Sequence, residues 1–344
     1  MMKKERNKSF DIAKGIAIIL MVLGHSGCPK YLNSLIYSFH MPCFFFISGY
    51  LLKEQHFMDK MNFVRRKFNG IYIPFIKWSL IFLVFHNIFT ILHLYDNTYH
   101  LVDFKFKVFQ ILTMTGTEQL LGGFWFLKEL LYASIIGFFC IYCLESFGLK
   151  KRKKLLFTLP MVFIVLAYLL SIAPFKIPTI GSKTMLACGY YTLGYAIRVS
   201  KFKLPTISII PLIILLALIP FFFSGSMDVS GTDIFIYFIS SLLGCGVILC
   251  LSDMLSKSHF VTNAFSQIGQ STLYILIFHF ISFKLVSYIV ITINNWSIEK
   301  LSSFPILSTN YHYLWIVYGI VGVVFPFFIW KLSKTNWKSL IINH

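Results

Sequence analysis

Long apolar runs constrain this sequence more than any other feature. An α-helix needs roughly 20 residues to cross the hydrocarbon core of a bilayer. Hydrophobic residues make up 57% of the chain and charged residues only 13%, which excludes a soluble globular fold. We expect membrane-spanning helices near residues 12–28, 31–52, 70–94, 121–145, 155–174, 180–199, 207–224, 233–252, 270–294 and 309–332.

The basic residues indicate how these helices are oriented. The net charge of +18 comes from short clusters between the apolar runs, such as residues 3–8, 65–67 and 150–154. Lys and Arg concentrate in the cytoplasmic loops of membrane proteins, and an even number of spans leaves both termini on one side. The sequence therefore predicts an all-α integral protein of the cytoplasmic (inner) membrane, with about ten transmembrane helices and both termini cytoplasmic. The scattered charge argues against a nucleic-acid partner and leaves the lipid bilayer as the expected surroundings.

The connections between the apolar runs are short. Residues 53–69, 95–120, 253–269 and 295–308 form the longest of them, and none is long enough for an independent domain. No internal repeat or Ser/Gly-rich linker divides the chain. We expect residues 1–344 to form a single transmembrane domain.

The first apolar run carries three ionisable residues, Asp11, Lys14 and His25. Helix geometry places Lys14 and His25 on one face, about 16 Å apart along the axis. Ionisable groups at membrane depth usually face a protein interior or a water-filled cavity, where they mark a pathway or a reaction site. Asp11 lies three residues from Lys14, close enough for an ion pair. The alternative is that Asp11 and Lys14 only anchor the end of the helix at the membrane surface.

Several short motifs occur together in the first 131 residues of the chain. They are "FDIAKG" at 10–15, "GH" at 24–25, "FHMP" at 39–42, "SGY" at 48–50 and "GGFWFLKELL" at 122–131. Together they resemble the signature of membrane acyltransferase family three, and most closely its fucose 4-O-acetylase-like branch. One departure is Lys14, where much of the family has Arg. Lys keeps the charge but lacks the planar, bidentate fork of Arg.

The resemblance implies transfer of an acyl group, usually acetyl from cytoplasmic acetyl-CoA, to a hydroxyl of a cell-envelope glycan or its lipid-linked precursor. A neutral imidazole that removes the hydroxyl proton typically contributes about 10²- to 10⁴-fold to such a reaction. We expect His25 to act as this general base or as a transient acyl carrier, with Lys14 and Asp11 engaging CoA at the other end of the same face.

Substrate-binding candidates come from the second and fourth runs. Pro42 interrupts the second run, and broken helix at membrane depth is tolerated where it lines a cavity. His40 therefore either lines the site or donates to a main-chain carbonyl freed by the break. In the fourth run, Trp125, Lys128 and Glu129 offer an aromatic platform and hydrogen-bond partners for a sugar. The alternative is an interfacial Trp and a structural ion pair.

Basic residues before the third run are candidates for cofactor binding. Arg65, Arg66 and Lys67 would contact CoA phosphates, or they would face anionic lipid as topology determinants. His279, in the ninth run, is as readily structural as functional. The ten histidines are scattered without ligand spacing, so we expect no metal.

Two other functional classes fit parts of this pattern. A ten-span transporter for a small solute or glycan precursor would also contain intramembrane charges and Pro-broken helices. A structural module of a polysaccharide-assembly complex would need none of the polar residues for chemistry. Replacing His25 separates these classes, because only the enzyme depends on its imidazole to form an ester.

Overall fold

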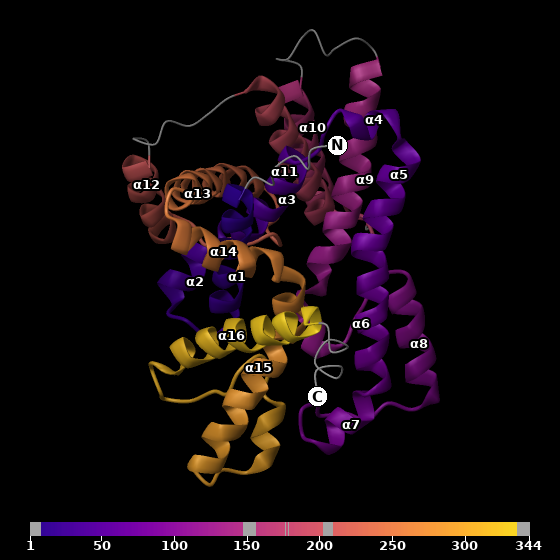
Figure 1. Cartoon of the computed structure of the whole chain (residues 1–344). Helices are drawn as coiled ribbons and strands as arrows, with labels where there is room; N and C mark the ends of the chain where they lie inside the picture. The colour runs from indigo at the N-terminus through magenta and orange to yellow at the C-terminus, as the bar shows by residue number, and fades with distance from the viewer. Residues whose placement is uncertain (1–7, 147–155, 176, 178, 202–208, 336–344) are drawn as a thin grey trace, which may run out of the picture.

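The computed structural model describes residues 8–146, 156–175, 177, 179–201 and 209–335, and all regular structure in these ranges is helical. Figure 1 shows the helices in chain order. They are α1 (Lys8–His25), α2 (Lys30–Tyr37), α3 (His40–Tyr50), α4 (Gln55–Met58), α5 (Lys60–Lys67), η1 (Phe68–Tyr72), α6 (Ile73–Val84), α7 (His86–Ile91), α8 (Leu101–Leu112), η2 (Gln119–Phe124), α9 (Trp125–Ser146), α10 (Thr158–Ile172), α11 (Ser182–Ser200), α12 (Ile209–Phe222), α13 (Asp233–Leu255), α14 (His259–Gln270), α15 (Thr272–Ile293), η6 (Ile298–Ser302) and α16 (Leu314–Lys334).

Within the described ranges, five helical segments are long and apolar enough to cross a membrane. They are Lys60–Val84, Gln119–Ser146, Asp233–Leu255, Thr272–Ile293 and Leu314–Lys334, and the apolar helices α10 and α12 are shorter. Helices α5, η1 and α6 form the first of these segments, which runs beside α8 and α9 (Figure 1). These apolar helices are those of a multi-pass membrane protein.

Helix α1, which carries Asp11, Lys14 and His25, occupies the interior of the bundle. It contacts α2, α3, α13, α14, α15 and α16, so most of its surface is covered by other helices. Asp11 is only 2% exposed, and the face that carries Lys14 and His25 points into the protein rather than towards lipid. This enclosure explains how α1 accommodates charged residues that a lipid-facing helix would not tolerate.

Residues 31–52, expected as one span, are divided into two helices. Helix α2 ends at Tyr37, and Phe39 leaves helical geometry with φ −149° before α3 begins at His40. His40 Nδ1 donates to the carbonyl of Ile36 at 2.7 Å, and Ser38 Oγ donates to Leu35. The side chains at the break thus satisfy carbonyls that a continuous helix would have paired.

Residues 253–269, expected as a loop, contain α14, which packs directly on α1. The approach requires glycine on both sides. A Cβ at Gly15 would lie 2.4 Å from the carbonyl oxygen of Phe265, and a Cβ at Gly269 would lie 1.8 Å from the carbonyl oxygen of Asp11. Helix α14 therefore fixes the position of the half of α1 that bears Lys14.

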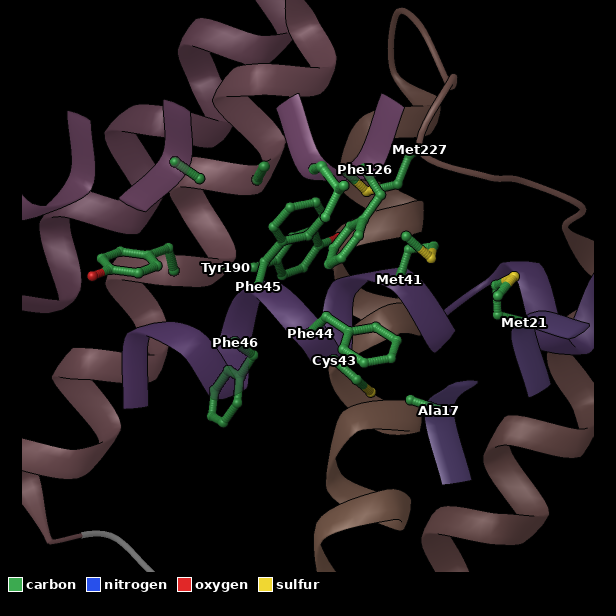
Figure 2. Packing of buried hydrophobic residues seen from close by; sticks show 14 of the residues in the cluster. Ala17, Met21, Met41, Cys43, Phe44, Phe45, Phe46, Phe126, Tyr190 and Met227 are labelled. Atoms are coloured by element: carbon green, nitrogen blue, oxygen red, sulfur yellow. The ribbon is translucent and has the colours of Figure 1, made fainter. Parts of the chain in front are cut away.

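The buried core lies among α1, α3, α9, α11, α13 and α15 and is rich in aromatic and thioether side chains. Figure 2 shows Met21, Met41, Phe44 and Phe126 within this one cluster. The rings of Phe44 and Phe126 lie 5.4 Å apart between centroids, in the range of favourable aromatic pairs.

Candidate active site

His25 is the last residue of α1, and its imidazole lies among aromatic side chains. Its Nδ1 is 3.1 Å from Tyr37 Oη on α2. Its ring centroid lies 5.6 Å from that of His279 and 5.2 Å from that of Phe280, both on α15. His25 as a residue is half-buried, and its imidazole is enclosed by these neighbours.

Two further histidines flank His25 and are held in one orientation by the main chain. His40 Nδ1 faces the carbonyl of Ile36, and His279 Nδ1 faces the carbonyls of Ile275 and Leu276 at 3.0 and 3.1 Å. Because carbonyls only accept, both rings carry their proton on Nδ1 and leave Nε2 as an acceptor. His279 Nε2 is buried and has no hydrogen-bond partner among the described residues.

A cavity of about 210 Å³, which we call the His25 cavity, adjoins this histidine cluster. Its walls come from α1, α2, α3, η2, α9, α13, α15 and the connection between α12 and α13. The polar side chains that line it include those of His25, Tyr37, His40, Trp125, Ser226 and Asp228. The cavity thus combines an imidazole with hydroxyl, carboxylate and aromatic groups, which can hydrogen-bond to or stack on a ligand.

A second cavity of about 270 Å³, the Lys14 cavity, lies further along the same face of α1. Lys14 and Ser48 supply polar groups to a mainly apolar wall that includes Phe44 and Phe126. Leu51, which is 39% exposed, and the exposed Gly70 also line it. The cavity therefore reaches the protein surface near the end of α3 and at η1, within the long α5–η1–α6 helix.

The two cavities meet at three side chains. Met21, Met41 and Leu276 line both cavities, and we call this set the neck. The chemistry on the two sides differs, with an ammonium in the Lys14 cavity and an imidazole in the His25 cavity. The predicted common face of Lys14 and His25 thus leads along two adjoining cavities, although the two side chains are too far apart to touch.

Charged side chains around the Lys14 cavity are paired or exposed. Lys14 Nζ lies 3.2 Å from Asp11 Oδ1, which is the ion pair expected from their spacing. Lys67 Nζ donates to Ser48 Oγ at 3.3 Å. Arg65 and Arg66 point to the exposed side of α5 and line neither cavity. Of the three predicted phosphate contacts, Lys67 is the one attached to the cavity wall.

The three substrate-binding candidates from the fourth run do not share one location. Trp125 lines the His25 cavity, whereas Lys128 and Glu129 line neither cavity and approach each other at 3.5 Å. The structure instead brings Lys183 and Asp228 to Trp125. Lys183 Nζ lies 4.3 Å from the Trp125 ring centroid and is ion-paired with Asp228.

Lys183, Asp228 and Tyr37 were missed by the sequence reasoning. Lys183 and Asp228 come from helix ends and connections far from the motifs, and no local pattern marks them. Tyr37 lies two residues before the "FHMP" motif, where the break between α2 and α3 turns its hydroxyl towards His25. That break could have been read as a sign that the residues before it also face the site.

Lys284 has a structural role. Its ammonium donates to the carbonyls of Leu301, Ser302 and Ser303 at 2.7, 3.0 and 2.8 Å. The segment fixed in this way continues to Phe304, whose ring lies 4.6 Å from that of Phe280, the neighbour of His25. Lys284 therefore holds the loop that packs behind the imidazole.

The described residues contain no cluster of three or more His, Cys, Asp or Glu side chains that could hold a metal ion. No curated protein and no solved structure gives a match to this chain in the comparisons. The model of acyltransferase family three, described as an acyltransferase domain, matches residues 7–331 and so includes α1, both cavities and nearly all described helices. The chain therefore belongs to this family of membrane acyltransferases.

Proposed function

We propose that this protein is an O-acetyltransferase of the cytoplasmic membrane, with both termini in the cytoplasm. It transfers acetyl from cytoplasmic acetyl-CoA to a hydroxyl of a cell-envelope glycan or its lipid-linked precursor. The observation that carries the proposal is the meeting of two chemically different cavities at the neck. A donor and an acceptor that enter separately would meet there beside His25. The resemblance of the motifs to the fucose 4-O-acetylase-like branch supports a sugar hydroxyl as the acceptor.

In this proposal the Lys14 cavity receives the donor. Its opening at Leu51 and Gly70 would admit the pantetheine arm of acetyl-CoA, while the nucleotide part stays outside. Lys14, neutralised in part by Asp11, and Lys67 on Ser48 supply positive charge for CoA oxygens. The exposed Arg65 and Arg66 precede Gly70 by about one helical turn and would meet the phosphates at the entrance.

The His25 cavity would bind the acceptor. Trp125 supplies an aromatic surface, Asp228 and Lys183 supply an acceptor and a donor for sugar hydroxyls, and His40 lines the wall. Lys128 and Glu129 would influence the acceptor site indirectly, because Glu129 is close enough to Lys183 to interact with it electrostatically. No substrate contact with Lys128 or Glu129 is needed.

The chemical step uses His25 as the base. Nε2 of His25 takes the proton of the attacking hydroxyl. The oxygen of that hydroxyl forms the new ester bond to the acyl carbon, and the C–S bond of the thioester breaks. The CoA thiolate leaves and takes the proton from the imidazolium. This role requires a proton on Nδ1, with the Tyr37 oxygen as its acceptor at 3.1 Å. In the variant with a transient acyl carrier, Nε2 attacks the thioester carbonyl first, the C–S bond breaks and the CoA thiolate leaves. The hydroxyl oxygen of the acceptor then takes the acyl group from Nε2, the N–C bond breaks, and the hydroxyl proton goes to the thiolate.

A complementation experiment tests the proposal. Cells that lack this protein receive the wild type, His25→Ala or the matched control His312→Ala at equal membrane abundance. His312 is exposed and lines neither cavity. We expect ester-linked acetate on the envelope glycan to return with the wild type and the control and to fall about 100-fold or more with His25→Ala. Full restoration of ester-linked acetate by His25→Ala would refute the role of His25 as base or acyl carrier. Movement of a solute without ester formation would favour the transporter instead.

A further inference from the structure

We infer that Met21, Met41 and Leu276, the neck, select the acyl group by its length. This inference rests on the proposed acyl transfer and adds the structural basis of donor choice. The three residues come from α1, α3 and α15 and are only 2%, 6% and 4% exposed. They line both the cavity proposed for the donor and the one proposed for the acceptor.

Each neck residue is attached beside a histidine of the site. Met21 precedes His25 by four residues, so the two side chains lie on one face of α1, one turn apart. Met41 follows His40 directly, and Leu276 precedes His279 by one turn and offers its own carbonyl to the His279 ring. Met21 therefore lies about 6 Å of helix rise from His25, and Met41 and Leu276 line the same cavity as this imidazole. A thioester carbonyl that reaches His25 must leave its alkyl chain in or next to the neck.

The chemistry of the neck suits an alkyl group. A thioether is only a weak acceptor and Leu has no polar side-chain atom, so a methyl or methylene group loses no hydrogen bond on entering. The polar side chains lie on either side, with Lys14 and Ser48 in one cavity and His25 and His40 in the other. Met side chains have three rotatable bonds, so they can move aside for a small group.

The neck side chains themselves are closely packed. Leu276 lies against η2, where a Cβ at Gly123 would be 2.8 Å from its Cδ1. Phe44 and Phe126 pair at 5.4 Å in the adjoining wall. Each further methylene must displace packed side chains, and discrimination of one methylene in an apolar pocket is typically about 10- to 200-fold. The neck therefore admits acetyl and disfavours butyryl.

Membranes that contain the full chain and the host's own envelope fraction provide the test. Ester formation is measured with acetyl-, propionyl- and butyryl-CoA, and the rate ratio of butyryl to acetyl is compared among variants. We expect Met41→Ala and Leu276→Ala to raise this ratio about tenfold or more. The milder Leu276→Val should raise it less, and it keeps the test available if a larger truncation fails to fold.

Two matched controls distinguish acyl-chain selection by the neck from a general loss of packing in the protein core. Met41→Leu nearly preserves volume and should keep the wild-type ratio. Met185→Ala truncates another buried methionine, on α11, which lines neither cavity. A ratio unchanged in Met41→Ala and Leu276→Val, or raised equally in Met185→Ala, overturns the inference while acyl transfer itself stands. Failure of the wild type to transfer acyl from any thioester refutes the proposed function and the inference with it.

Discussion

Replacement of Gly15 by Ala tests how far the position of α1 depends on α14. The added Cβ would lie 2.4 Å from the carbonyl oxygen of Phe265, whereas real Cβ contacts essentially never fall below 3.0 Å. The contact must therefore open by at least the difference, about 0.6 Å. Both sides are helix backbone, so α1 and α14 must separate as units. Overpacking of this kind typically costs about 1–3 kcal/mol.

Gly15→Ala should lower the rate of acetyl transfer more than it lowers the stability of the protein. Gly15 is next to Lys14, and misplacement of a positioning group by about 1 Å can cost about 100-fold in rate. We therefore expect Gly15→Ala to lower acetyl transfer at least tenfold, and Gly269→Ala to lower it further because its clash, at 1.8 Å, is more severe. The assay measures ester formation in membranes and the thermal midpoint of each variant in detergent.

Gly181→Ala is the control for this prediction. A Cβ at Gly181 would meet nothing within 4 Å, and the residue lines neither cavity. It should keep wild-type transfer. Wild-type activity and thermal midpoint in both Gly15→Ala and Gly269→Ala would refute the close contact between α1 and α14.

Three further substitutions test separate parts of the account. Tyr37→Phe removes the hydrogen bond to the imidazole, worth about 1 kcal/mol, and should lower kcat about fivefold at unchanged protein abundance; an unchanged kcat would show that this bond does not orient the ring. Lys284→Met leaves three carbonyls without their charged donor and should lower the free energy of unfolding by about 1–3 kcal/mol. This loss should appear as a lower thermal midpoint in detergent, and an unchanged midpoint would contradict the anchoring role of Lys284. Lys67→Met should raise KM for acetyl-CoA severalfold with little change in kcat, whereas the exposed Lys105→Met on α8 should not; equal KM values would remove Lys67 from the donor site.

Helix periodicity was sufficient to relate Lys14 to His25. The eleven-residue spacing predicts a common face at about 16 Å, and the structure gives each residue a cavity on that face with a shared neck. The Asp11–Lys14 pair also follows from spacing alone. Such local relations depend only on one helix, which the sequence specifies well.

Relations between helices could not be obtained in this way. Lys128 and Glu129 are near Trp125 in sequence, yet of the three only Trp125 lines one of the two described cavities, because the rotation of α9 is set by its packing partners. Lys183 and Asp228 reach Trp125 from distant segments. Helix α14 is short and partly polar, so the search for apolar runs assigned it to a loop. Its fit against α1 depends on Gly15 and Gly269, which carry no hydropathy signal.

The most direct test of the central claim follows radiolabelled acetyl from acetyl-CoA supplied to the cytoplasmic face of sealed membrane vesicles. Hydroxylamine-labile label on the glycan fraction is compared between the wild type and His25→Ala at matched abundance. The account predicts rapid labelling by the wild type and a rate lowered about 100-fold or more in His25→Ala, with binding of acetyl-CoA retained. Labelling by His25→Ala at the wild-type rate would contradict the claim that the donor and the acceptor meet at this imidazole.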